Sequence, residues 1–148
     1  MIIDMKISEY EMPEDLFYTK SYAWVRKESE TLRVGVIDFA VKLAGKIEYV
    51  DLPPVNEHYE KDDVYGTIES GKWVGEMIMP LSGTVVEINS ALRTHPEPIN
   101  DDPYGAGWLM VMNPDNIDHL SSLLSDPDEI AAWLKDEIKS KKKTTEKS

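Results

Sequence analysis

A β-hairpin pattern near the middle of the chain constrains the fold more than any other feature. Residues 64–69 and 73–79 are rich in β-branched and aromatic residues, which favour strands. Between them lies the tetrapeptide Glu69-Ser70-Gly71-Lys72, whose small and polar residues are typical of turns. The pattern predicts an antiparallel hairpin over residues 64–79, with Lys72 exposed at its tip.

A lysine at the tip of a hairpin can be reached by a modifying enzyme. Its ammonium group can be acylated through an amide bond, which removes the charge. Exposed turn lysines are common, so the local sequence by itself favours an ordinary solvated lysine at position 72. The rest of the chain has to decide between the two interpretations.

Further strand-length segments lie on both sides of the hairpin. We expect strands at residues 18–26, 32–38, 46–52, 84–89 and 108–112, and a loop over residues 90–107, which are rich in Pro, Asn, Asp and Gly. Between the second and third strands, Asp38 to Leu43 predicts a short helical turn, with Asp38 as its cap and Phe39 and Leu43 facing inward.

The C-terminal part is expected to be helical. Residues 114–124 carry apolar residues at helical spacing, and Ser125-Asp126-Pro127 is a strong helix start. The helix that follows has one apolar face, made of Ile130, Trp133, Leu134 and Ile138. The predicted fold is therefore mainly β with C-terminal helices.

Composition excludes several classes of protein. The chain of 148 residues is the size of one domain, and it contains no run of about 18 apolar residues that would span a membrane. Its N-terminus does not resemble a secretory signal, so we expect a cytoplasmic protein without a membrane partner. The absence of cysteine excludes disulfides and thiolate chemistry, and the net charge of −12 argues against a nucleic-acid partner.

No constellation of catalytic residues stands out, so we expect a protein that is not itself an enzyme. The three histidines have no metal-ligand spacing, and neither a phosphate loop nor a nucleophile elbow is present; these histidines are His58, His95 and His119.

Several motifs occur in the order found in one known protein family. The chain resembles the H protein of the glycine cleavage system over residues 16–125, through Tyr18-Thr19-Lys20-Ser21-Tyr22-Ala23-Trp24, Val34-Gly35-Val36-Ile37-Asp38-Phe39-Ala40, Ile68-Glu69-Ser70-Gly71-Lys72, Pro80-Leu81-Ser82-Gly83-Thr84-Val85 and Asp102-Pro103-Tyr104-Gly105-Ala106-Gly107-Trp108. In that family the matching lysine carries lipoic acid as lipoamide. The resemblance therefore implies covalent lipoic acid on Lys72, and the barrel-sandwich hybrid fold of lipoyl and biotinyl domains.

Four segments follow from this resemblance and from the helix pattern. We expect an N-terminal leader at 1–15, the lipoyl-carrier domain at 16–125, a packed C-terminal helix at 126–139 and a disordered basic tail at 140–148.

The sequence departs from the family at the attachment site. The usual Glu-Ser-Val-Lys-Ala has Gly71 in place of valine and Trp73 in place of the final alanine, and the usual His-Glu-Trp is Tyr22-Ala23-Trp24. The resulting Gly-Lys-Trp-Val-Gly looks more like the lipoate-binding, H-like proteins of a heterodisulfide-reductase-like sulfur-oxidation system. With Glu69 and Ser70, these flanking residues form the surface that a ligase or a partner enzyme would read.

The resemblance implies a swinging-arm carrier that a lipoate ligase or lipoyl transferase loads. In glycine cleavage its partners are a pyridoxal-phosphate glycine decarboxylase, an aminomethyltransferase and dihydrolipoyl dehydrogenase, and the cargo is an aminomethyl group. In the sulfur-oxidation version the cargo is sulfur and the partner is a heterodisulfide-reductase-like complex. The alternatives are an H-like interaction module with free Lys72, a biotinyl carrier, whose lysine usually lies between two methionines, and, least favoured, a freestanding enzyme.

Overall fold

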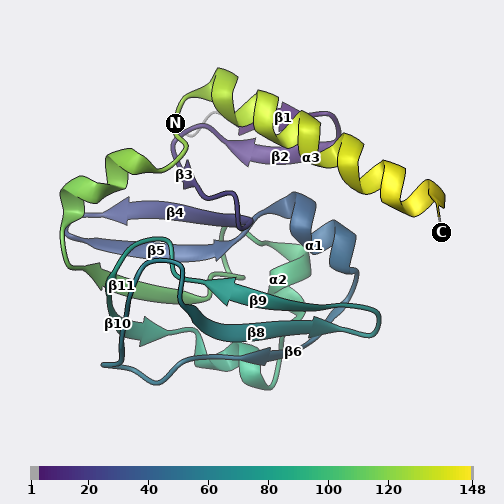
Figure 1. Cartoon of the computed structure of the whole chain (residues 1–148). Coiled ribbons are helices and arrows are strands. Elements are labelled where there is room, and N and C mark those ends of the chain that lie inside the picture. Colours follow the sequence, from purple (N-terminus) through teal and green to yellow (C-terminus); the bar gives the residue numbers. More distant parts are fainter. Residues whose placement is uncertain (1–3, 148) are drawn as a thin grey trace.

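The computed structural model describes the backbone of residues 4–147 and the side chains of residues 6–141. Figure 1 shows its strands and helices, which are β1 (Asp4–Ile7), β2 (Tyr10–Pro13), β3 (Phe17–Tyr18), β4 (Ala23–Glu28), β5 (Thr31–Val36), α1 (Asp38–Ala44), β6 (Ile47–Asp51), β7 (His58–Tyr59), β8 (Val64–Ser70), β9 (Val74–Ile78), β10 (Gly83–Ile88), η1 (Ser90–Arg93), α2 (Glu97–Asp101), β11 (Met110–Pro114), η2 (Ile117–Ser122) and α3 (Pro127–Lys147). The described part is mainly β with C-terminal helices, as the sequence predicted.

Two antiparallel sheets enclose the larger of two apolar cores. One sheet has six strands in the order β3-β4-β5-β11-β10-β7, and the other has three in the order β6-β8-β9. Their facing side chains, such as Val34, Ile68 and Met110, are buried between them. This arrangement confirms the predicted barrel-sandwich fold with its β8–β9 hairpin.

A second core lies where the N-terminal hairpin meets α1 and α3. The strands β1 and β2 pair with each other, and α3 lies across them (Figure 1). Met12, Phe39, Ile130 and Leu134 are among the side chains buried in this core. Residues 4–13 of the predicted leader therefore form strands that belong to the folded body.

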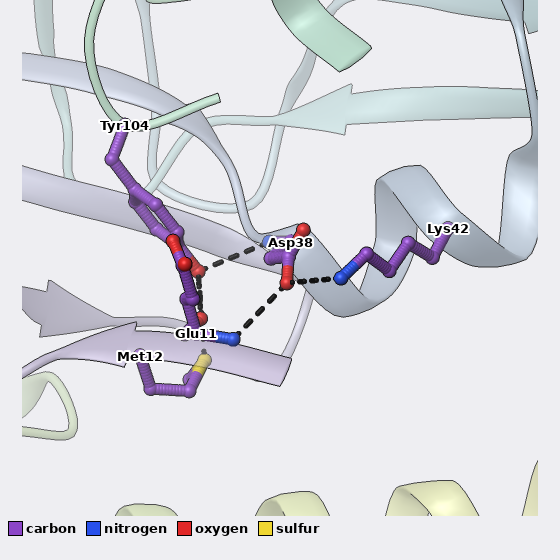
Figure 2. Close-up of polar contacts among 5 residues, drawn as sticks. All are labelled: Glu11, Met12, Asp38, Lys42 and Tyr104. Carbon is purple, nitrogen blue, oxygen red and sulfur yellow. Dashed lines mark hydrogen bonds and ion pairs between the residues drawn. The ribbon is translucent and has the colours of Figure 1, made fainter. Parts of the chain in front are cut away.

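A group of polar contacts fixes the N-terminal hairpin to α1 (Figure 2). The Asp38 carboxylate accepts a hydrogen bond from the Glu11 backbone N–H at 3.0 Å and pairs with the Lys42 Nζ at 3.0 Å. The hydrogen bond to Asp38 raises the pKa of Lys42. Tyr104 completes the group, because its hydroxyl donates to the Glu11 carbonyl at 2.6 Å and accepts from the Asp38 N–H.

Two local predictions around α1 were wrong in detail. Asp38 lies in the first turn of the helix rather than at its cap, which is Ile37 without a side-chain hydrogen bond. Leu43 is 36% exposed, whereas Phe39 is buried as expected. In β6, the register with β8 shifts between Ile47 and Tyr49, and Tyr49 is exposed.

The C-terminal half differs from its prediction in three places. The expected loop over residues 90–107 contains the short helices η1 and α2, and only 117–122 of the helical segment at 114–124 is a helix, of the 3₁₀ type. The start of α3 was predicted correctly, since the Asp126 carboxylate accepts from the Glu129 N–H at 3.1 Å. The helix continues to Lys147, beyond the predicted end at 139, and residues 140–147 lack the glycine or proline that would stop it.

Candidate functional site

The turn between β8 and β9 holds Lys72 at one end of the three-stranded sheet, near the end of α1 (Figure 1). The Ser70 backbone N–H donates to the Trp73 carbonyl at 2.8 Å, which closes the turn. The Ser70 hydroxyl oxygen accepts from the Lys72 N–H at 3.4 Å. Lys72 is exposed, so the local geometry presents its side chain to solvent.

The stem of Lys72 runs beside Gly45, in the connection between α1 and β6. A Cβ placed on Gly45 would lie 3.3 Å from the Lys72 Cε and 3.8 Å from its Nζ. Gly45 has φ of 83° and ψ of −155°, a conformation that glycine adopts far more readily than other residues. The missing Cβ therefore leaves a shallow cradle along the lysine stem.

Asn100 of α2 holds this cradle in place. Its amide oxygen accepts from the Ile47 N–H at 2.9 Å, and its amide nitrogen donates to the Gly45 carbonyl at 2.9 Å. These two bonds fix both sides of the connection between α1 and β6. Sequence reasoning gave neither Gly45 nor Asn100 a place in the site.

The Trp73 indole packs over Gly75. A Cβ on Gly75 would stand 2.0 Å from the Trp73 Cη2, so the indole occupies the space that a larger residue would need. Gly71 has no such constraint, because a Cβ added there would have the Glu48 carboxylate oxygens as its nearest neighbours, at 3.8 and 4.0 Å. Gly75 thus makes room for the Trp73 indole, whereas Gly71 is not constrained by a neighbouring side chain.

A small cavity of about 50 Å³ lies between the two sheets beneath Trp73. Its walls include Tyr22, Ala23 and Tyr65. Burial raises the pKa of Tyr65, and burial together with a 2.6 Å hydrogen bond to Glu137 raises the pKa of Tyr22. Both hydroxyls therefore stay protonated near neutral pH.

The structure brings the five predicted site residues together at one turn: Glu69, Ser70, Gly71, Lys72 and Trp73. Their roles stay a prediction. His58 does not join them, since it pairs with Asp115 at 2.8 Å, which raises the pKa of His58. Among the described residues, no cluster of three or more His, Asp or Glu side chains could hold a metal ion.

In the described part of the chain, no helix has both the length and the apolar character needed to cross a membrane.

Comparison with known proteins links this geometry to one family. A family model described as Glycine cleavage H-protein matches residues 16–137. The glycine cleavage system H protein of Geobacillus kaustophilus is 42% identical over 113 residues, which cover 76% of this chain and 89% of that protein. The probable glycine cleavage system H protein of Pyrococcus horikoshii is 40% identical over 132 residues, or 88% of this chain and 98% of that protein.

A solved structure agrees. The crystal structure of a glycine cleavage system H protein from Mycobacterium marinum superposes with a TM-score of 0.68 at 32% sequence identity, and covers 75% of this chain and 97% of that one.

Proposed function

We propose that Lys72 carries a lipoyl group, because this chain belongs to the glycine cleavage H-protein family, whose members are lipoyl-carrier subunits and not enzymes in themselves. The observation that carries the proposal is the position of Lys72 in the β8–β9 turn, exposed and with its stem beside the Gly45 cradle. The residues fit the group, since an acylated lysine at this turn meets open space and needs no rearrangement of the hairpin.

The bound lipoyl group would supply a redox-active dithiolane that accepts and passes on a cargo. The chain itself supplies the tether and its orientation. Ser70 closes the turn, and Asn100 fixes Gly45 so that the lysine stem has room to lie against the connection. Tethering raises the effective concentration of the arm at the site of a bound partner enzyme.

The wall of the cavity beneath Trp73 favours sulfur over an aminomethyl group as the cargo. Ala23 lines this cavity at the position where the family usually has the glutamate of His-Glu-Trp. Glu76, which is exposed, is the one carboxylate among the lining residues. A cationic amine needs a carboxylate partner when it leaves water, and sulfur does not. The Gly-Lys-Trp-Val-Gly context points the same way.

The partners follow from the cargo. Glycine cleavage H proteins work with a pyridoxal-phosphate decarboxylase, an aminomethyltransferase and dihydrolipoyl dehydrogenase. For this chain we favour a heterodisulfide-reductase-like complex as the acceptor, after loading by a lipoate ligase or lipoyl transferase. A free Lys72 in an interaction module and a biotinyl carrier are the competing functions, and Gly71 and Trp73 replace the methionines that usually flank a biotinyl lysine.

Intact mass with peptide mapping tests the attachment. The protein is produced with a lipoate ligase and lipoate, beside a Lys72→Arg control. We expect one lipoyl increment on the peptide that contains Lys72 and none in the control. An unmodified Lys72 with every ligase tried would reject the carrier assignment, and a biotinyl increment would support the biotinyl alternative.

A second experiment tests the cargo. Lipoylated protein is offered to a glycine decarboxylase, and glycine-dependent exchange of carbon dioxide is measured for the wild type and for Ala23→Glu. We expect weak exchange with the wild type and an increase of about tenfold or more with the variant, since a charge-assisted hydrogen bond contributes about 1.5–3 kcal/mol. Rapid exchange with the wild type would instead support the aminomethyl cargo.

A further inference from the structure

A groove lies at the base of the β8–β9 hairpin, at the opposite end from Lys72, and has no role in the proposed function. It has a volume of about 320 Å³, within the range of about 300–1,000 Å³ that is usual for small-molecule sites. Four segments that are distant in the sequence line it, at residues 18–21, 61–62, 78–80 and 122–124. The groove is therefore a product of the tertiary fold.

The buried part of the lining is apolar. It consists of Tyr18, Met79, Pro80 and Leu123. Ile78 and Leu124 are half-buried beside them. An apolar chain or ring that enters the groove would leave water on this side, which favours binding.

The exposed part of the lining is polar and carries an excess of positive charge. Lys20 and Lys61 are both exposed there, and Asp62 is the one carboxylate among the lining residues. In the part of the chain that the structure describes, neither lysine forms an ion pair. The whole chain has 28 Asp and Glu against 16 Lys and Arg, so the charge of this groove is opposite to that of the molecule. Such a site attracts an acid group.

Hydrogen bonds fix the two turns that carry these lysines. The Thr19 Oγ1 accepts from the Ser21 N–H at 3.3 Å, which closes the turn around Lys20. The Ser82 hydroxyl oxygen accepts from the Lys61 N–H at 2.8 Å and donates to the Glu60 carboxylate at 3.0 Å. Both backbone segments are thus held in place without a ligand.

Further hydrogen bonds join the walls to one another. Tyr18 and Leu124 exchange two backbone bonds, at 2.8 and 2.9 Å, and the Asp62 N–H donates to the Met79 carbonyl at 3.0 Å. These contacts connect all four lining segments in pairs. A preformed groove of this kind needs little ordering when a ligand binds, which lowers the cost of binding.

We propose that this groove binds a small amphipathic acid, a diffusible molecule whose apolar chain or ring lies on Met79 and Leu123 and whose carboxylate or phosphate pairs with Lys20 and Lys61. The inference does not need an acylated Lys72, so it stands or falls independently of the proposed function. It adds a ligand site at the end of the hairpin that is farthest from the attachment lysine.

Titration of the labelled, unmodified protein with 4-phenylbutanoate and with phenyl phosphate tests the proposal through amide and methyl chemical shifts. We expect saturable changes at Lys20, Lys61 and Met79 within about 10 mM, as the usual binding energy per ligand atom implies. The proposal would be overturned if neither probe gave a saturable change in this range. Changes centred on Ala23 and Tyr65 would place the probes in the cavity beneath Trp73, and would also overturn it.

Two further probes separate the apolar part of the ligand from its acid group. We expect 4-phenylbutan-1-ol, which lacks the charge, and inorganic phosphate, which lacks the ring, each to bind at least about fivefold more weakly than the amphipathic acids. An alcohol that binds as well as the carboxylate would contradict the role of the lysines. Inorganic phosphate that binds as well as phenyl phosphate would contradict the role of the apolar lining.

Substitutions on the rim assign the charge to particular residues. Lys20→Gln and Lys61→Gln should each weaken binding of 4-phenylbutanoate about two- to fivefold, as is usual for an exposed ion pair. Asp62→Asn should strengthen it by a similar factor, and asparagine tolerates the φ of 73° at this position. Lys27→Gln, on the exposed surface of β4, is the matched control and should leave the affinity unchanged. Equal affinities in all four variants would show that the acid group does not bind between these residues.

Discussion

At the scale of single residues, Gly71 and Gly75, the two glycines near Lys72, differ in the atoms that surround them. Both belong to the Gly-Lys-Trp-Val-Gly segment, in which the sequence places Gly71 in the turn and Gly75 in the strand that follows. A Cβ at Gly75 would meet the Trp73 indole, whereas a Cβ at Gly71 would lie in open space near Glu48. The tryptophan and the second glycine therefore form a pair, and a Cβ at position 71 would meet no steric conflict.

The packing of Trp73 over Gly75 predicts that substitutions at these two positions have coupled effects on the free energy of unfolding. Gly75→Ala should destabilise the protein by about 1–3 kcal/mol, since the added methyl group forces the indole away. Adding Trp73→Ala to the same variant should relieve that clash, leaving a coupling of about 1 kcal/mol or more in a double-mutant cycle measured by urea unfolding. Gly71→Ala is the control and should stay within about 0.5 kcal/mol. Additive effects at 73 and 75 would contradict the packing described.

At the scale of elements, α1 joins two regions that matter for the site. Its first residue, Asp38, binds the β2 strand through the Glu11 N–H, and its end leads into Gly45 beside Lys72. Asp38 is the one buried charged side chain among residues 6–141, at 7% exposure. The N-terminal hairpin thus helps to fix the helix that leads into Gly45 beside the Lys72 stem.

Removing this carboxylate should loosen the hairpin. Asp38→Ala leaves the Glu11 N–H without its acceptor and should cost about 2–4 kcal/mol, whereas Lys42→Ala removes an ammonium that is half-exposed and should cost about 1 kcal/mol or less. Hydrogen exchange checks the mechanism, because the Glu11 amide should lose protection in Asp38→Ala and retain it in Lys42→Ala. Unchanged protection of that amide in both variants would show that the contact is not stabilising.

At the scale of the whole molecule, two apolar cores stabilise a single folded unit. The larger core fills the space between the sheets, and the smaller one is covered by α3, whose Ile130 and Leu134 are fully buried. Trp24 belongs to the second core and lies on β4 of the six-stranded sheet, so the two cores are joined through that strand. The hydrogen bond from Tyr22 to Glu137 ties α3 to the wall of the cavity beneath Trp73.

This organisation predicts a single cooperative unfolding transition. Leu134→Ala should lower the free energy of unfolding by about 2–5 kcal/mol, as is usual for a fully buried leucine, and Lys135→Ala on the exposed face should change it by about 0.5 kcal/mol or less. Fluorescence and far-ultraviolet circular dichroism should report the same midpoint. Separate midpoints would mean that the hairpin and α3 unfold independently of the sheets.

The sequence by itself determined the features that depend on neighbouring residues. Strand-forming runs around Glu69-Ser70-Gly71-Lys72 were enough to place the hairpin, and Ser125-Asp126-Pro127 was enough to place the start of α3, because turns and helix ends are set by local backbone preferences. The order of family motifs supplied the fold and the class of carrier.

Only the tertiary structure decided which distant residues meet. Asp38 was expected to cap its own helix, but a backbone N–H 27 residues away competes for the same carboxylate. The Asn100 amide donates a hydrogen bond to the Gly45 carbonyl, 55 residues away in the sequence. No local sequence pattern predicts a contact over that sequence separation. The space beside Gly45 for the Lys72 stem and the position of the indole over Gly75 arise in the same way, because packing between elements, and not preference within them, sets where side chains leave space.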